Sequence, residues 1–294
     1  MARGIDHIVH AVRDLDGAAD LYRRMGFIVG ARNTHPWGTH NHIVQCPGSF
    51  IELLTVAEPD RLSDDGMSNL FGRYHREYLS RGEGLSLLIL ESKDAKADVA
   101  DYKRAGIAAA SEAIHFEREA KRPDGTPIKV GFSLAFADDT VAMPVRFATC
   151  QQHYPENFWN PAFQTHPNGT KEIRSVIMVA DGPERHRGFA SAYTGSTDFY
   201  AEPGEVSLWL PRGSFSIMTP GRFQAAFGGP QPTPGNHLQA IRFAVADVAA
   251  TRASMRTNGI GLRDHRDGFV IDPVDAMGAT LSFEPIKSPR KPAC

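Results

Sequence analysis

Glu52 is the side chain of this sequence whose surroundings most need a chemical explanation. It lies inside the apolar run Phe50–Val56, and a carboxylate buried there without a partner would be strongly destabilising. Exposure at a sheet edge, an ion pair with an arginine, or coordination of a metal ion would each resolve this. Carboxylate oxygens are good ligands for divalent metals, so Glu52 is a candidate metal ligand.

The alternation of side chains along a strand decides which neighbours Glu52 could meet. Glu52 shares one face of its predicted strand with Phe50, and His7 shares one face of another predicted strand with Val9. His10 is out of phase with His7. We therefore expect His10 to face the helix layer, as a core histidine with satisfied hydrogen bonds.

The elements that must position these residues recur four times along the chain. Each copy has an apolar strand, an acidic residue, a helix and a glycine, followed by further strand-like segments. The opening strands are His7–Val12, Leu85–Leu90, Ser175–Val179 and Ala240–Val245. The acidic residues and glycines that enclose the helices are Asp14 and Gly26, Asp94 and Gly106, Asp181 and Gly195, and Asp247 and Gly259.

This repeat predicts an α+β fold made of four β-α-β-β-β units. An aspartate at a helix start accepts hydrogen bonds from first-turn amides, and a glycine at the end adopts the left-handed conformation. Two units side by side give a curved mixed sheet with helices outside and a ligand cup inside. We predict two such domains, residues 1–165 and 166–294, with a boundary near the turn-rich segment 161–171.

Several motifs resemble those of the vicinal oxygen chelate superfamily, which includes glyoxalase I, bleomycin-resistance proteins and extradiol dioxygenases. Two of them are Asp6-His7-Ile8-Val9 and Phe50-Ile51-Glu52-Leu53. More narrowly, Trp37-Gly38-Thr39-His40-Asn41 and Gln152-His153-Tyr154-Pro155-Glu156 resemble segments of glyoxalase-like proteins. Function varies widely within this superfamily, so the resemblance is more specific for the fold than for the reaction.

The resemblance implies a divalent metal ion at the floor of the cup, held by the first and last strands of each unit. It assigns His7 and Glu52 as ligands in the first unit, with Glu52 also the candidate catalytic base. An imidazole nitrogen and a carboxylate with open coordination positions suit Zn, Ni, Mn or Fe. The matching positions of the C-terminal half carry Ile217 and Ser282. We therefore expect that half to be a degenerate copy without metal ligands.

The second unit departs from the pattern of the family. Its opening strand offers no ligand at the inward position, but its closing strand supplies Thr149, Gln151 and His153 at a period of two. We expect this set to face the cup, with His153 as the third metal ligand and Gln151 as the next candidate. The alternative for His153 is a simple hydrogen bond at a strand end. Gln151 and His42 are expected to bind substrate.

Three functions are compatible with these residues. The first is a metal-dependent lyase or isomerase of the glyoxalase type, acting on a small substrate chelated through adjacent oxygens. The second is an Fe(II) ring-cleaving dioxygenase, if His7, His153 and Glu52 form a two-histidine, one-carboxylate triad. The third is a non-enzymatic protein that binds or sequesters a small molecule in the cup.

Composition limits the partners. The net charge is −2, with 32 basic and 34 acidic residues mixed along the chain, which gives no basic stripe for nucleic acid. The apolar runs are too short to cross a bilayer, and no signal-peptide pattern precedes the first strand, so we expect a cytoplasmic protein. Cys46, Cys150 and Cys294 are expected to be free thiols. An unpaired edge of a sheet can pair with a second copy of the chain, so a homodimer stays an alternative to a monomer.

Overall fold

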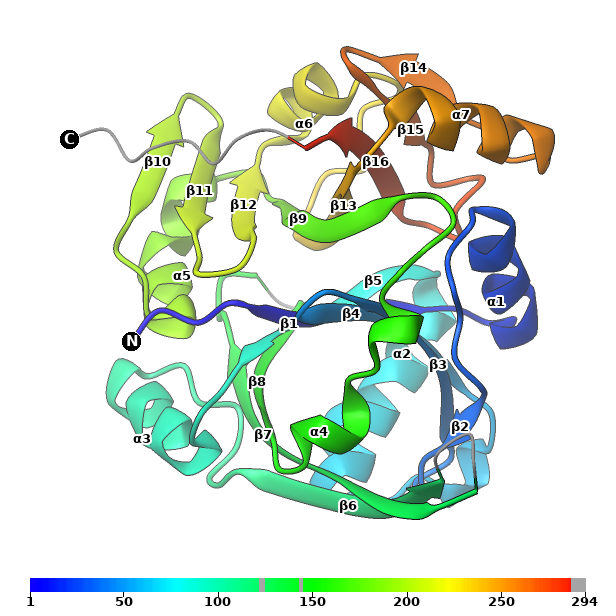
Figure 1. Ribbon diagram of the computed structural model, residues 1–294. Coiled ribbons are helices and arrows are strands. Elements are labelled where there is room, and N and C mark those ends of the chain that lie inside the picture. Colours follow the sequence, from blue (N-terminus) through cyan, green and yellow to red (C-terminus); the bar gives the residue numbers. More distant parts are fainter. Residues whose placement is uncertain (122–124, 143–144, 287–294) are drawn as a thin grey trace.

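The computed structural model describes residues 1–121, 125–142 and 145–286 of the chain. Their strands belong to one large curved mixed sheet, and the helix of each repeated unit packs on its outer face (Figure 1). The predicted α+β fold with four β-α-β-β-β units is confirmed. Cys46 and Cys150 are buried free thiols, whereas Cys294 lies outside the described residues.

The first two units occupy the lower half of the molecule in Figure 1. The elements of the first are β1 (Ile5–Ala11), α1 (Leu15–Arg24), β2 (Asn33–Thr34), β3 (Thr39–Cys46) and β4 (Ser49–Val56). A connection follows with η1 (Pro59–Arg61), η2 (Ser68–Arg73) and α2 (Tyr74–Arg81). The second unit contains β5 (Gly84–Glu91), α3 (Ala95–Ala105), β6 (Ile114–Lys121), β7 (Pro127–Asp138) and β8 (Arg146–Gln152).

The last two units form the upper half, after a linker with α4 (Pro155–Phe158) and η3 (Pro161–Phe163). The third unit contains β9 (Thr170–Val179), η4 (Pro183–His186), α5 (Arg187–Thr194), β10 (Phe199–Glu202), β11 (Glu205–Trp209) and β12 (Ser214–Met218). After α6 (Pro220–Phe227) the fourth unit contains β13 (His237–Val245), α7 (Val248–Thr257), β14 (Arg263–His265), β15 (Gly268–Ile271) and β16 (Thr280–Pro285).

The same strand pairing repeats in all four units and fixes the shape of each half. In every unit the first strand pairs in parallel with the last, as β1 does with β4 and β5 with β8. Units are joined through their first strands, which run antiparallel: β1 beside β5 and β9 beside β13. One bridge, Leu238 to Leu85, connects the sheets of the two halves.

Three of the four predicted aspartate caps are present at helix starts. The side chain of Asp14 accepts from the amide of Gly17, Asp94 from Lys96 and Ala97, and Asp247 from Ala250. These bonds satisfy first-turn amides that have no partner within the helix.

The prediction for the third unit is wrong, because Asp181 does not cap α5. Pro183 begins the short helix η4 there, and α5 starts only at Arg187. The intervening turn also accounts for the longer spacing between acid and glycine in that unit. Gly195, as predicted, ends α5 in the left-handed conformation.

The helix side of the sheet holds one core that crosses both halves. Phe27 of the first unit packs against Phe243 and Phe283 of the fourth, and Phe147 of the second packs against Phe189 of the third. By strand pairing the chain separates into two halves, which meet between β8 and β9. The apolar core on the helix side, however, is shared by both halves. Separate domains at residues 1–165 and 166–294 stay a prediction.

The inner faces of the two halves differ. In the C-terminal half, α6 packs Phe223 and Phe227 against Ile177 and Val179 of β9, so part of that inner face is covered by the chain itself. In the N-terminal half the inner face carries a separate apolar cluster that includes Val9, Leu54 and Cys150. The pocket described below lies on this face.

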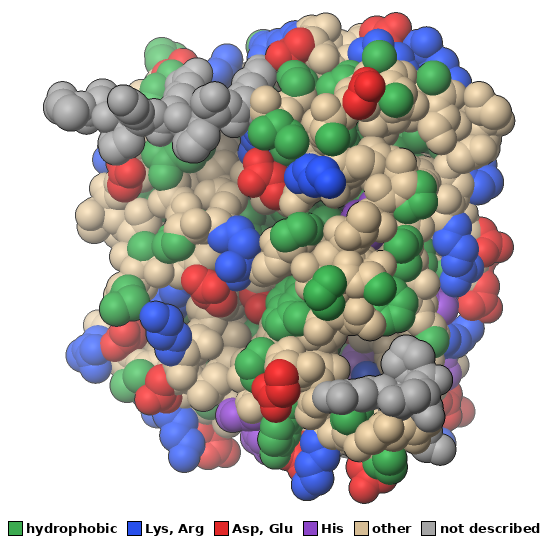
Figure 2. All heavy atoms as spheres, in the orientation of Figure 1, with side chains coloured by type: hydrophobic (Ala, Val, Ile, Leu, Met, Phe, Trp, Pro, Cys, Tyr) green, Lys and Arg blue, Asp and Glu red, His purple; other side chains and the backbone are tan. Residues whose placement is uncertain are grey.

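The outer surface carries charges of both signs. On the face shown in Figure 2, basic and acidic side chains are interspersed, with no large patch of one sign. Among the described residues, no helix combines the length and the hydropathy that a membrane span requires.

Acid should destabilise this fold through its buried histidines. His75 is fully buried, where its Nδ1 bonds to the carbonyl of Phe71 and its Nε2 to the hydroxyl of Ser86. Desolvation lowers the pKa of His75 from 6.5 to about 3. Below pH 6.5 the unfolded chain takes up a proton that the folded chain excludes, so stability is present above that pH and lost as the pH falls.

The variant His75→Gln should remove this contribution and keep a side chain that can hydrogen-bond. Urea unfolding at pH 7, 6 and 5 should show a shallower loss of stability in the variant than in the natural chain. The slope should differ by up to about 1.4 kcal/mol per pH unit. Equal slopes would mean that His75 is protonated in the fold.

Candidate functional site

His7 and Glu52 lie together on the floor of the N-terminal cup. The parallel register of β1 and β4 places Phe50 beside His7 and Glu52 beside Val9, so the two polar side chains project from the same inner face. His7 Nε2 and Glu52 Oε2 are 3.9 Å apart. Both residues are only 5% exposed, and the ring of Phe50 stacks on the imidazole at 4.1 Å.

A carboxylate sets the orientation of the His7 ring. Nδ1 of His7 lies 2.5 Å from Oδ1 of Asp6, and Oδ2 of Asp6 accepts from Nε2 of Gln152 at 2.9 Å. Because a carboxylate accepts, Nδ1 donates the proton of this bond, and in the neutral ring Nε2 is the nitrogen with the free lone pair. This is how outer carboxylates commonly prepare histidines that bind metals.

The carboxylate of Glu52 has one engaged oxygen and one that faces His7. Asn41 Nδ2 donates to Oε1 at 2.5 Å, while Oε2 has no hydrogen-bond partner among the described residues and lies 3.9 Å from His7 Nε2. Burial raises the pKa of Glu52, and the hydrogen bond from Asn41 offsets part of that rise, as does the charge of His7 when its ring is protonated. Glu52 has no arginine partner among the described residues, so the predicted alternatives of an exposed edge and an arginine ion pair do not apply.

A line of hydrogen bonds extends from Glu52 to the wall of the pocket. Arg118 of β6 donates to Oδ1 of Asn33, and Nδ2 of Asn33 donates to Oδ1 of Asn41, both at 3.0 Å. Since the guanidinium can only donate, it fixes the orientation of both amides. Asn41 must then present its NH2 group to Glu52, which agrees with the bond described above.

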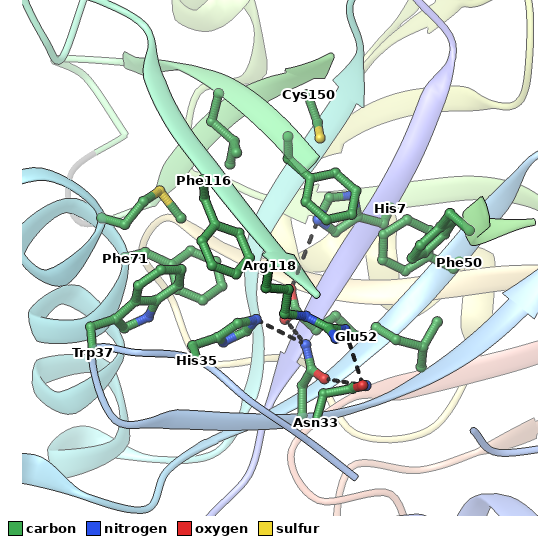
Figure 3. Close-up of a pocket in the computed structure, with 16 residues that line it drawn as sticks. His7, Asn33, His35, Trp37, Phe50, Glu52, Phe71, Phe116, Arg118 and Cys150 are labelled. Carbon is green, nitrogen blue, oxygen red and sulfur yellow. Dashed lines mark hydrogen bonds and ion pairs between the residues drawn. The ribbon is translucent and has the colours of Figure 1, made fainter. Parts of the chain in front are cut away.

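These polar groups open into a pocket that encloses about 590 Å³ of space between atoms, part of it open to solvent. Figure 3 shows aromatic rings on both sides of the polar line. His35 stacks on Trp37 at 4.7 Å, and desolvation lowers its pKa to about 3, so it is neutral. The residues that line the cavity are His7, Asn33, His35, Trp37, Asn41, Ile43, Phe50, Glu52, Met67, Phe71, Phe116, Arg118, Phe132, Leu134, Cys150 and Phe158.

The predicted orientation of the closing strand β8 is wrong. Ala148 and Cys150 belong to the inner cluster and Gln152 reaches Asp6, whereas Thr149 bonds to Asp98 beneath α3. The set Thr149, Gln151 and His153 therefore faces away from the cup, because alternation places neighbouring residues on opposite faces.

Two of the predicted site residues on this strand lie elsewhere as a result. Gln151 accepts a hydrogen bond from the amide of Ala95 at the start of α3. His153 is exposed and bonds to the hydroxyl of Ser133 at 2.8 Å. Neither residue joins His7 and Glu52, so the structure does not offer His153 as the third ligand.

His42, predicted to bind substrate, also faces the helix side. Its Nδ1 bonds to the carbonyl of Gly30 at 2.8 Å, and its Nε2 lies 3.8 Å from a carboxylate oxygen of Asp16. His10 behaves as predicted, with its nitrogens 3.0 Å from the hydroxyl of Tyr22 and the carbonyl of Met277.

Asn41 and Arg118 complete the site, and neither was among the predicted site residues. Of these two residues, only Asn41 could have been placed from the sequence. The tight turn at Pro47-Gly48 pairs Ile43 with Glu52 across the hairpin, so residues 41, 43 and 45 had to share the face of Glu52. Counting along the strand from this pair would have identified Asn41, in place of His42, as a residue that faces the cup. Arg118 follows a long irregular connection after α3, and no local pattern places it in the cup.

Comparisons with known proteins agree with this fold. A sequence model of the glyoxalase-like domain family matches residues 5–194, which is more than half of the chain and extends past residue 165. No curated protein sequence matches the chain. The family match shows that the chain belongs to the glyoxalase-like domain family, in agreement with the resemblance found in its motifs.

Three solved structures show the same architecture at low sequence identity. A hypothetical protein from Staphylococcus aureus superposes with a TM-score of 0.68 and 16% identity, over 97% of this chain and 100% of its own. A mutant of 4-hydroxymandelate synthase from Streptomyces coelicolor gives 0.52 and 12%, over 90% and 77%. The 2,2',3-trihydroxybiphenyl 1,2-dioxygenase of Sphingomonas wittichii gives 0.50 and 9%, over 96% and 90%. Likeness at these identities concerns the fold alone.

Replacing Asn41 should change the acidity of Glu52. In Asn41→Leu, the carboxylate form loses the hydrogen bond to Oε1, so the pKa of Glu52 should rise further. Carbon-13 NMR titration of glutamate-labelled, chelator-treated protein measures this directly, with Glu52→Gln assigning the signal. The exposed Asn69→Leu serves as a matched control. An unchanged or lower pKa in Asn41→Leu would contradict the role given to Asn41.

Proposed function

We propose that this protein is a metal-dependent enzyme of the glyoxalase type, a lyase or isomerase that moves a proton on a small oxygenated substrate. One observation carries the proposal: His7 Nε2 and Glu52 Oε2 face each other, 3.9 Å apart, on the buried floor of the pocket. Neither atom has another hydrogen-bond partner among the described residues.

The chemistry of these donors fits a divalent ion such as Zn, Ni, Mn or Fe. Asp6 leaves the lone pair of His7 Nε2 free, and a cation would offset the cost of burying the Glu52 carboxylate. Among the described residues, no three His, Cys, Asp or Glu side chains lie together in a group that could hold a metal ion. His7 and Glu52 would thus hold the ion alone, leaving positions for water and for two adjacent substrate oxygens. A bound ion supplies Lewis-acid polarisation of those oxygens.

The protein's own residues would prepare the proton transfer. Glu52 is the candidate base as well as a ligand, because it is the one carboxylate among the described residues that line the pocket. Asn41 holds one carboxylate oxygen and leaves Oε2 directed at the substrate space. The aromatic walls, including Phe50, Phe116 and Phe132, would exclude water from the reacting groups.

The two other functions receive less support from the geometry. A ring-cleaving dioxygenase would need a second histidine beside His7 and Glu52, and His153 is exposed on the other face of β8. Non-enzymatic binding is the stronger alternative, because the aromatic walls would hold an apolar compound with or without a metal. The metal content of the protein separates this alternative from the proposed enzyme.

Metal analysis of the purified protein, after reconstitution with each ion, tests the proposal. The natural chain should retain about one equivalent of one ion. His7→Ala and Glu52→Gln should each lose it, because a single remaining donor binds too weakly. His153→Ala is the matched control, since it removes an exposed histidine and should leave metal content unchanged.

Two results would contradict the proposal of a metal-dependent enzyme. One is that the natural chain binds no ion under any of these conditions. This result would favour the non-enzymatic binding protein. The other is an ion retained in His7→Ala and Glu52→Gln but lost in His153→Ala, which would move the site to the outer surface.

A further inference from the structure

Arg118 is a charged side chain in the pocket that the proposed proton transfer does not use. It projects from β6 into the same cavity as His7 and Glu52 (Figure 3). Its hydrogen bonds go to neutral oxygens: the side chain of Asn33 at 3.0 Å and the backbone carbonyl of Glu119 at 3.4 Å. No carboxylate of the described residues lies within ion-pair distance of it.

The absence of such a partner is unusual for this chain. Most described arginines have a carboxylate within 4.0 Å, among them Arg32, which pairs with Asp16, and Arg146, which pairs with Asp138. A guanidinium stays protonated at any physiological pH, so Arg118 holds a full positive charge in a partly desolvated position. Such a charge is stabilised when an anion enters the pocket and pairs with it.

The walls around Arg118 indicate what the anion is attached to. Phe116, on the same face of β6, meets Trp37 edge to face at 4.9 Å and lies parallel to Phe132 at 6.4 Å. Phe50 and Phe158 line the other side, 5.0 Å apart. Aromatic rings stack favourably with flat, apolar ligands. The pocket therefore offers one positive group and a wide apolar surface.

We infer that the pocket accepts a carboxylic acid with an aromatic or similarly flat apolar body, its carboxylate paired with Arg118 and its far end at His7 and Glu52. This assignment of a substrate class rests on the proposed function for the reaction, although binding of the acid does not need it. A carboxylate suits the site because a guanidinium binds it through two parallel hydrogen bonds. Arg118 is the one basic side chain among the described lining residues other than histidine, which matches a single negative charge.

Asn33 would also act in recognition. Its Oδ1 accepts from Arg118, and its Nδ2 donates to Asn41. The position of the guanidinium therefore orients the Asn41 amide that donates to Glu52. The acid group of a ligand and the carboxylate at the floor are thus connected through two amides. In this scheme Arg118 binds the non-reacting end of the substrate, and Asn33 is a positioning residue that acts through Arg118.

Binding of matched acids and amides tests the inference. The probes are benzoate, phenylacetate and 3-phenylpropionate, each beside its carboxamide, measured by isothermal titration calorimetry on the full chain. Metal is first removed with a chelator, so the readout depends on neither metal nor turnover. At least one acid should bind the natural protein about tenfold to a hundredfold more tightly than its amide.

Variants then assign the preference to Arg118. Arg118→Gln should abolish it, and Arg118→Lys should retain part of it because the charge remains. Lys129→Gln is the matched control: Lys129 lies on the adjacent strand β7, outside the cavity, and pairs with Glu117, so its loss should leave the preference intact. Circular dichroism and thermal unfolding confirm that each variant is folded.

The inference fails if no acid is preferred over its amide, whether because both bind alike or because neither binds. It also fails if the preference survives in Arg118→Gln or disappears in Lys129→Gln. The metal experiment described above can fail independently. An acid preference without metal binding would leave a carrier of aromatic acids, and metal binding without an acid preference would leave an enzyme with a different substrate.

Discussion

The parallel pairing of β1 with β4 is the constraint on which the site depends. It carries His7 and Glu52 to one face of the sheet and sets 3.9 Å between the nitrogen and the oxygen that face each other. The same pairing encloses both groups between apolar strands, and this enclosure raises the pKa of Glu52. A shift of one residue between the strands would turn Glu52 toward the helices and separate the pair.

The remainder of the site compensates for the burial of these two groups. Asp6 and Gln152 hold the imidazole from one side, and Asn41 holds the carboxylate from the other. The atoms of His7 and Glu52 that these bonds leave free, Nε2 and Oε2, face each other on the floor of the pocket. The C-terminal half contributes to the helix-side core, where Phe243 packs against Phe27 of the first unit.

The sequence predicts the fold well and the site only in part. Repeated caps, glycines and apolar strands reveal four units, because those signals are local and each unit repeats them. Glu52 stands out because its charge interrupts an apolar run, and His7 follows from the resemblance to the superfamily. The orientation of β8 could not be derived, since its inward residues Cys150 and Gln152 are no more distinctive than their outward neighbours. Arg118 reaches the pocket through a tertiary contact that no periodicity encodes.

The most direct test of the central claim is anomalous X-ray diffraction from crystals of the protein soaked with Mn or Ni. The account predicts one strong peak on the floor of the pocket, between the His7 and Glu52 side chains, about 2.0–2.2 Å from His7 Nε2 and from Glu52 Oε2. A map with no peak at this position would contradict it. So would a peak found only at the surface histidines His115 and His153, whose rings lie 5.0 Å apart.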